Sequence, residues 1–303
     1  MDANVALLSV GDNLPAGWRP PGDTEGRNFY LSSELARFYS EGADDYHELW
    51  APELLKLSRS MIERLPLEDA NRILDAGAGV GSLLPELSSR APSAQVVGAD
   101  LAEGMIALAP KDFGTAVMDA RHLGFQAASF DVVVLAFVLF HVDDPGSVLA
   151  EALRVLQPGG TVGTVTWGED PSYLALDVWN DELQAHGAPP PVGGFARYDT
   201  VNTTDKVRSL LAAMGFTGVG AWTGLYENRM TLEGFLRHRT GHGMSRLRFE
   251  ALADDARASC IQSVRARLED VGPAGFVDRT EVIYAMAERG RILPPPGHTE
   301  DER

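Results

Sequence analysis

Three glycines at alternate positions constrain the fold of this chain more than any other feature. They lie in the segment RILDAGAGVGSLLPEL, residues 72–87, and are Gly77, Gly79 and Gly81. An apolar run precedes them and a helix-like spacing of leucines follows, which predicts a strand, a tight loop and a helix. Glycine lets such a loop turn sharply and lets a ligand approach the backbone. The free N–H groups of the following helix then face that ligand.

The spacing of the loop separates two ligand classes. A dinucleotide fingerprint needs glycine at its first, third and sixth positions, but here Gly81 is fifth and Ser82 is sixth. With Asp75 two residues before the first glycine, the pattern is D-x-G-x-G-x-G. It resembles the methionine-end loop of the class I S-adenosylmethionine (SAM) methyltransferases. By itself, the loop leaves a nicotinamide-dependent oxidoreductase open as an alternative.

Apolar strands alternate with short helices along most of the chain. After the loop we expect strands at residues 94–100, 115–117, 130–136, 161–167, 219–226 and 279–286, and helices at 103–109, 147–156, 173–186 and 206–214. Such alternation predicts an α/β fold with a parallel sheet. The resemblance implies a Rossmann-like class I methyltransferase fold, with a seven-stranded, mostly parallel sheet flanked by helices. The turn L-x-P-G-G at residues 156–160 supports it, because it recurs at this place in that family and not in dehydrogenases.

Net charge and cysteine content exclude several functions. The formal net charge of −17 argues against a nucleic-acid partner and against an anionic membrane surface. The single cysteine, Cys260, excludes an intramolecular disulfide and a cysteine-based metal site. The N-terminus has no signal-peptide pattern, and the longest apolar run, residues 132–140, is too short to span a bilayer. We expect a cytoplasmic protein without a metal ion, and leave a homodimer open.

We expect four parts in the chain. They are an arm with a helical lid at 1–68, a SAM-binding core at 69–169, the rest of the sheet at 170–292 with a helical substrate-cap insertion at about 230–272, and a disordered tail at 293–303. In the lid, the helical pattern starts at Ser32, with Ser32 or Ser33 as its cap, and Gly42 interrupts it.

Tyrosines of the lid are candidates for contact with the cofactor. In the resembled family, N-terminal helices often carry tyrosines that close over the methyl donor, and the segment YSEGADDYHELW is similar to that element. A positive sulfonium favours aromatic and oxygen-bearing neighbours. We expect Tyr39 to bind the cofactor, Tyr46 to take part in catalysis and Tyr30 to belong to the substrate cap. The alternative is plain core packing of a helix pair.

Two acidic residues follow the second and third strands, where ligands of open α/β sheets bind. A carboxylate at Asp100 can accept hydrogen bonds from both ribose hydroxyls, although it could instead cap the next helix. Asp119, beside the backbone N–H of Ala120, offers an acceptor for the adenine amine, or is a solvated loop residue. The resemblance favours the cofactor role for both, and we expect further contacts from Leu101 and Met105.

The segment FDVVVLAFVLFHVDDP, residues 130–145, resembles the fourth-strand segment of small-molecule methyltransferases. The resemblance implies that Ala136 and Phe137 contact the methionine moiety through their backbone. His141 lies just beyond, where the methyl group should point, and could take a proton from an acceptor. The alternative is a histidine that holds its own loop.

An excess of arginine in the expected cap suggests the chemistry of the acceptor. Residues 229–248 hold five arginines against one acid, and arginine grips carboxylates at two points. Arg239 and Arg246 are seven residues apart, on one face if the helix is continuous, so an acidic acceptor is one interpretation and a solvated helix face the other. The resemblance implies methyl transfer to a small molecule, such as a specialised metabolite, on O, N or C. A cyclase that keeps SAM as a structural ligand is the alternative on the same fold.

Overall fold

A seven-stranded sheet forms the centre of the molecule. The computed structural model describes residues 25–169, 172–189, 198–241 and 243–291. The strands are β1 Arg72–Ala76, β2 Gln95–Asp100, β3 Gly114–Val117, β4 Phe130–Ala136, β5 Leu156–Trp167, β6 Phe216–Arg229 and β7 Val277–Arg289. Their order across the sheet is β3-β2-β1-β4-β5-β7-β6, and β7 alone is antiparallel to its neighbours. The expected seven-stranded, mostly parallel sheet is confirmed.

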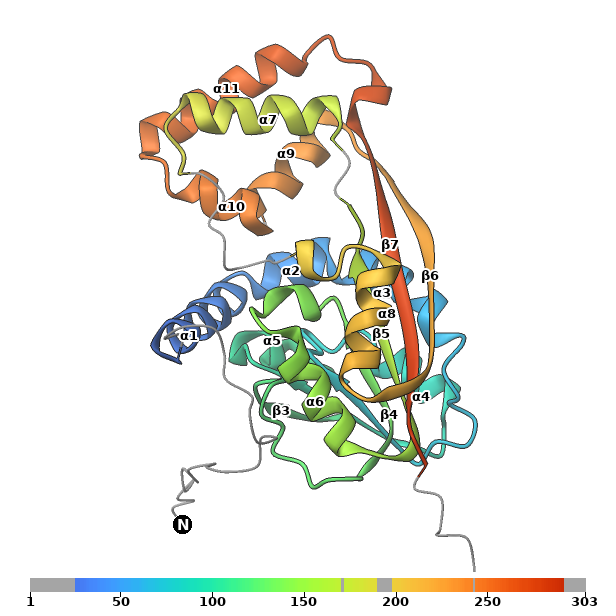
Figure 1. Cartoon of the computed structure of the whole chain (residues 1–303). Coiled ribbons are helices and arrows are strands. Elements are labelled where there is room, and N and C mark those ends of the chain that lie inside the picture. The colour runs from blue at the N-terminus through green and yellow to red at the C-terminus, as the bar shows by residue number, and fades with distance from the viewer. Residues whose placement is uncertain (1–24, 170–171, 190–197, 242, 292–303) are drawn as a thin grey trace, which may run out of the picture.

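Helices flank this sheet (Figure 1). They are α1 Glu25–Glu41, α2 Ala43–Leu49, α3 Ala51–Ile62, α4 Leu84–Arg90, α5 Glu103–Leu108, α6 Pro145–Val155, α7 Leu174–Ala185, α8 Thr204–Ala213, α9 Leu232–Gly241, α10 Gly243–Glu250 and α11 Asp254–Leu268. The central strands are buried on both faces, which explains the unbroken apolar run Val132–Leu135 in β4. Among the described helices, none has the length and apolar character needed to cross a membrane.

Two boundaries differ from the sequence expectation by five residues or more. Helix α1 begins at Glu25, so Ser32 and Ser33 lie inside it and the prediction that one of them caps it is wrong. Strand β5 begins at Leu156 instead of residue 161, because Phe130 of β4 pairs with Leu156 and Val132 pairs with Thr161. The L-x-P-G-G turn is therefore a bulge inside the strand, with Gly159 in the left-handed region at φ 86°.

The helices between β6 and β7 form a second hydrophobic core. The expected helical insertion is present as α9, α10 and α11, and its interruption falls between Gly241 and Gly243. Helix α7, which precedes β6 and was not expected to belong to the insertion, packs in the same core. Trp179 of α7 lies against Phe235 of α9. Figure 1 shows these four helices together at the far end of the long strands β6 and β7. The expected tail from residue 293 lies outside the described residues.

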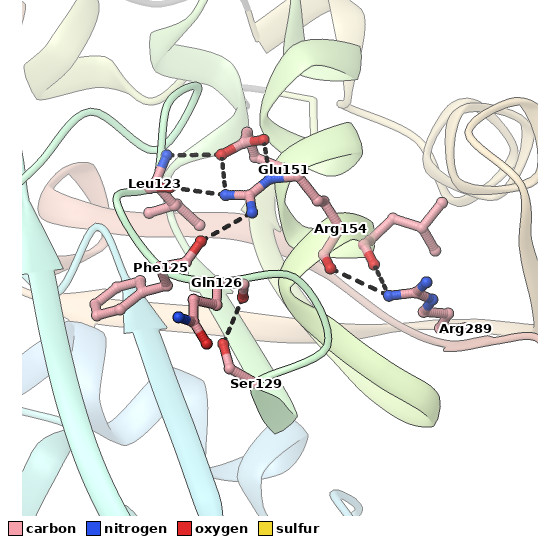
Figure 2. A network of polar contacts seen from close by, with 8 residues as sticks. Leu123, Phe125, Gln126, Ser129, Glu151, Arg154 and Arg289 are labelled. Carbon is pink, nitrogen blue, oxygen red and sulfur yellow. Dashed lines mark hydrogen bonds and ion pairs between the residues drawn. The ribbon is translucent and has the colours of Figure 1, made fainter. Parts of the chain in front are cut away.

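Two arginines fasten helix α6 to its surroundings (Figure 2). Arg154 donates to Glu151 and to the carbonyls of Leu123 and Phe125, and Glu151 accepts from the Leu123 N–H. This network fixes the segment that leads from β3 to β4. Where α6 ends and β5 begins, Arg289 of β7 donates to the carbonyls of Leu153, Arg154 and Leu156.

We expect Arg289→Met to lower the free energy of unfolding by about 2–3 kcal/mol, because it leaves the carbonyls of Leu153, Arg154 and Leu156 without their charged donor. Urea unfolding followed by circular dichroism measures this loss. Lys56→Met is the control, because Lys56 is exposed and makes an ion pair with Glu53 that contributes little. Equal midpoint shifts in the two variants would contradict the assignment.

Candidate cofactor and active site

A cavity of about 200 Å³ lies at the carboxyl ends of the parallel strands, where open α/β sheets bind ligands. The segments that follow β1, β2, β3 and β4 line it, together with Trp167 at the end of β5. Helices α1 and α2 cover it with Phe38, Tyr39 and Tyr46. The cavity therefore joins the glycine loop to the lid tyrosines.

The glycine loop has the backbone that the sequence pattern requires. Gly77, Gly79 and Gly81 have φ angles of 86°, 55° and 72°, which side chains other than glycine rarely adopt. A Cβ on Gly77 would meet Val138 at 2.2 Å, whereas one on Gly79 would stand beside Met105 at 3.2 Å and Tyr46 at 3.7 Å. Gly77 and Gly79 line the cavity, so the loop presents bare backbone to a ligand.

Two carboxylates support this loop. Asp100 accepts from the Gly79 N–H at 2.8 Å and from the Ala102 N–H at 2.9 Å, and it lines the cavity. Asp75 is fully buried, and neither of its carboxylate oxygens has a hydrogen-bond partner among the described residues. Burial, and second the Asp100 charge, raise the pKa of Asp75 to about 7. A buried carboxylate without a partner is costly unless a ligand compensates it.

The segment after β3 lies against the same cavity. Met118, Asp119 and Ala120 line it, as do Leu101 and Met105 after β2. Asp119 is held by Arg121, whose Nη2 donates to Oδ2 at 2.6 Å. Burial alone would raise the pKa of Asp119, but the hydrogen bonds and charge of Arg121 hold it below its ordinary value. The carboxylate therefore stays ionised and able to accept a further hydrogen bond.

The segment after β4 brings His141 under the lid. Ala136 and Phe137 line the cavity, and Phe137 has a φ of 59°, an uncommon conformation that concentrates at functional sites. His141 Nε2 lies 2.9 Å from the Tyr39 hydroxyl, and the two rings meet edge to face. The predicted base thus contacts a predicted cofactor residue from a different element.

Tyr46 of α2 lies over the glycine loop, with its ring edge to face against Tyr39. Burial, with smaller effects from Asp100 and Asp75, raises the pKa of its hydroxyl above the ordinary value. The hydroxyl is therefore protonated at physiological pH and can donate a hydrogen bond, but it cannot act as a ready base.

Comparison with known proteins decides between the ligand classes. A family model described as a methyltransferase domain matches residues 74–163. The malonyl-(acyl-carrier protein) O-methyltransferase of Geobacter sulfurreducens is 34% identical over 189 residues, which cover 60% of this chain and 69% of that protein. The demethylmenaquinone methyltransferase of Thermus thermophilus is 35% identical over 201 residues, which cover 60% of this chain and 86% of that protein. The chain belongs to the class I SAM-dependent methyltransferases.

A solved structure shares the fold of this methyltransferase. Haemonchus contortus phosphoethanolamine N-methyltransferase 2, in complex with phosphomonomethylethanolamine and S-adenosylhomocysteine, matches with a TM-score of 0.52 at 19% identity, over 86% of this chain and 60% of that chain. This likeness concerns the fold alone. Membership of the family establishes SAM as the cofactor and a small molecule as the methyl acceptor, and it removes the oxidoreductase alternative.

Several predicted site residues do not line the cavity of the methyltransferase. Asp75 and Gly81 are not among its lining residues, and the side chain of Tyr30 is outside the described residues. Arg239 bonds the Tyr173 hydroxyl and lies 3.8 Å from Asp278, while Arg246 pairs with Glu250 at 2.8 Å. The prediction that the two arginines share one helical face is wrong, because Arg239 belongs to α9 and Arg246 to α10.

The sequence reasoning missed many of the cavity residues, among them Met118, Phe140 and Trp167. Trp167 is the last residue of an expected strand, so the rule that ligands bind at carboxyl ends could have found it. Phe140 and Met118 carry no such signal, because each reads as an ordinary apolar residue of a loop.

The raised pKa of Asp75 predicts how stability depends on pH in the protein without ligand. Below about pH 4, Asp75 is protonated in both the folded and the unfolded chain; between about 4 and 7 only the folded chain keeps the proton. The free energy of unfolding therefore falls as pH rises through this window. Urea unfolding at pH 5 and pH 8 measures the decrease in the free energy of unfolding between these two pH values. We expect this decrease to be smaller in Asp75→Asn than in the wild type by roughly 1–3 kcal/mol. The exposed residue Asp205 gives the control Asp205→Asn, and parallel curves for all three proteins would contradict the prediction.

Proposed function

We propose that this methyltransferase binds SAM along the loops after β1, β2 and β3 and methylates a small molecule, such as a specialised metabolite, near His141. The observation that carries the proposal is one cavity lined by the glycine loop, Asp100, Asp119 and His141. These residues come from four segments that are separate in the sequence and meet at this cavity. The cytoplasmic location and the homodimer stay predictions from the sequence.

The residues present fit the cofactor. Asp100 would accept hydrogen bonds from the ribose hydroxyls, since a carboxylate has about four acceptor sites and Asp100 uses some of them for backbone N–H groups of Gly79, Leu101 and Ala102. Gly79 leaves room for the methionine end against the backbone. The unpartnered carboxylate of Asp75, below the loop, suits a cationic amino group. Asp119 and the Ala120 backbone would hold the adenine.

When bound, SAM supplies a methyl group already activated on a positive sulfonium, so the protein mainly positions the reactants. Tyr39 and Tyr46 would place ring faces and hydroxyl oxygens near that charge. His141 would accept the proton that an acceptor hydroxyl, amine or ring N–H loses. Its hydrogen bond to Tyr39 ties this position to the lid, so the lid closes over the place where water must be excluded.

Release of S-adenosylhomocysteine tests the proposed reaction. We would incubate the purified chain with SAM and a small-molecule extract of cells, and follow S-adenosylhomocysteine by mass spectrometry. The proposal expects its release together with a product 14 mass units heavier than one extract component. If a component were rearranged with no S-adenosylhomocysteine formed, the cyclase alternative would be right.

A further inference from the structure

The cavity ends on a wall of tryptophans beneath the helical insertion. Trp50 and Trp167 both line the cavity, with ring centroids 6.4 Å apart, and Trp167 also lies 4.8 Å from the strained Phe137. The planes of the two indoles meet at 75°, so together they form an apolar corner in which a planar ligand can stack on one ring and touch the edge of the other. The wall lies on the opposite side of Phe137 from the glycine loop, since Phe137 follows β4 and Trp167 ends β5.

His238 of helix α9 packs directly against this wall. Its imidazole lies 4.3 Å from the Trp50 ring, at an interplanar angle of 43°. Both ring nitrogens are buried, and neither has a hydrogen-bond partner among the described residues. An imidazole always carries at least one N–H donor, and a buried donor or acceptor without a partner is expensive. Natural proteins rarely leave such groups unmet unless a water or a ligand meets them.

The charges around His238 favour a neutral ligand. Burial, and second the neighbouring Arg239 charge, lower the pKa of His238 to about 3, so the ring is uncharged at physiological pH. Arg239 itself lies 3.8 Å from the Asp278 carboxylate and bonds the Tyr173 hydroxyl. The Arg239 charge is therefore paired with a carboxylate, although its Nε has no hydrogen-bond partner among the described residues. The uncharged imidazole of His238 offers an anionic acceptor no opposite charge.

His238 does not itself line the cavity, so a ligand reaches its ring only if helix α9 is displaced. It is joined to the lid by an ion pair between Arg237 and Glu48, whose side chains are 58% and 63% exposed, and such pairs contribute little to stability. Its apolar face belongs to the separate core formed with α7 and α11. A displacement of the insertion therefore leaves the main core intact.

We propose that His238 determines acceptor specificity: the acceptor is an uncharged planar molecule that lies against Trp50 and Trp167 and hydrogen-bonds, through a hydroxyl or carbonyl group, to the imidazole of His238. This inference rests on the proposed function, because it assigns the acceptor side of the same cavity. It replaces the interpretation in which Arg239 and Arg246 grip an acidic acceptor.

Three probes with one ring system test the proposal. The purified chain, saturated with S-adenosylhomocysteine, is dialysed to equilibrium against 2-naphthol, 2-naphthoate or naphthalene at pH 7. His238→Phe keeps a flat ring on Trp50 and removes both nitrogens, and it replaces an unpartnered polar group by an apolar one, which folding tolerates. His186→Phe is the control, because His186 lies at the end of α7, which packs against the insertion, and it is bonded to Glu182 and Ser259.

The expected result is that the wild-type chain binds 2-naphthol more tightly than 2-naphthoate. His238→Phe should lower the affinity for 2-naphthol about tenfold and change the affinity for naphthalene less than twofold. His186→Phe should change neither affinity. Equal 2-naphthol affinity in wild type and His238→Phe, tighter binding of 2-naphthoate, or no binding of 2-naphthol would each overturn the inference. Failure of the wild-type chain to bind S-adenosylhomocysteine would overturn the proposed function as well, so the two failures are distinct.

Discussion

Gly79→Val is expected to abolish SAM binding while the fold stays intact. Gly79 has a φ of 55°, and an added side chain would enter the space between Met105 and Tyr46, where the methionine end of SAM is proposed to lie. The left-handed conformation costs a branched residue about 1–2 kcal/mol, which a domain of this size tolerates. Blocking the backbone approach removes the contacts of the whole methionine end, so we expect affinity to fall at least a thousandfold by calorimetry.

The control for this variant is Gly187→Val. Gly187 has a φ of 86° at the end of α7, and a Cβ there meets nothing within 4 Å. The variant therefore carries the same kind of backbone strain in open space, far from the glycine loop. It should lose some thermal stability and bind SAM like the wild type. SAM affinity that is unchanged in Gly79→Val, or equally reduced in both variants, would remove the loop from the cofactor site.

His141→Asn is expected to lower the rate of methyl transfer by roughly 10²–10⁴ while SAM affinity changes less than tenfold. Asparagine can keep a hydrogen bond to Tyr39 but cannot take up a proton. The measurement is the single-turnover rate with the acceptor identified from S-adenosylhomocysteine release, as a function of pH. If His141 is the base, the wild-type rate should fall as the pH is lowered, and the variant should lack this dependence.

Tyr39→Phe separates catalysis from anchoring. The Tyr39 hydroxyl lies 2.9 Å from His141 Nε2, so this variant removes the contact that asparagine at position 141 can keep, and it leaves the imidazole in place. If His141 is the base, Tyr39→Phe should slow transfer far less than His141→Asn does. Equal losses in the two variants, with a wild-type pH profile in both, would show that His141 only holds the lid and its loop.

The elements around the glycine loop could be predicted because their signals are local. Strand β4 has the predicted bounds, Phe130–Ala136, since an unbroken run of buried β-formers has no helical interpretation of that length. Gly77 and Gly79 have the left-handed backbone that the pattern required. Asp100 and Asp119 line the cavity because the carboxyl ends of parallel strands meet at one edge.

The contacts of the insertion could not be predicted, because they depend on packing between distant segments. Nothing in the sequence of α7 shows that Trp179 packs on Phe235. The interruption between α9 and α10 separates Arg239 from Arg246, and each already has a partner. His238 lies within the arginine-rich stretch 229–248, and only its burial against Trp50 makes it a candidate for ligand binding.

A crystal structure of the chain with S-adenosylhomocysteine tests the central claim most directly. The account predicts the ribose hydroxyls within hydrogen-bond distance of Asp100, the methionine end on the backbone of Gly79 and the adenine beside Asp119 and Ala120. The sulfur would then face the side of the cavity where His141 and Tyr39 meet. A complex in which the ligand lies outside this cavity, or in which its adenine occupies the glycine loop, would contradict the account.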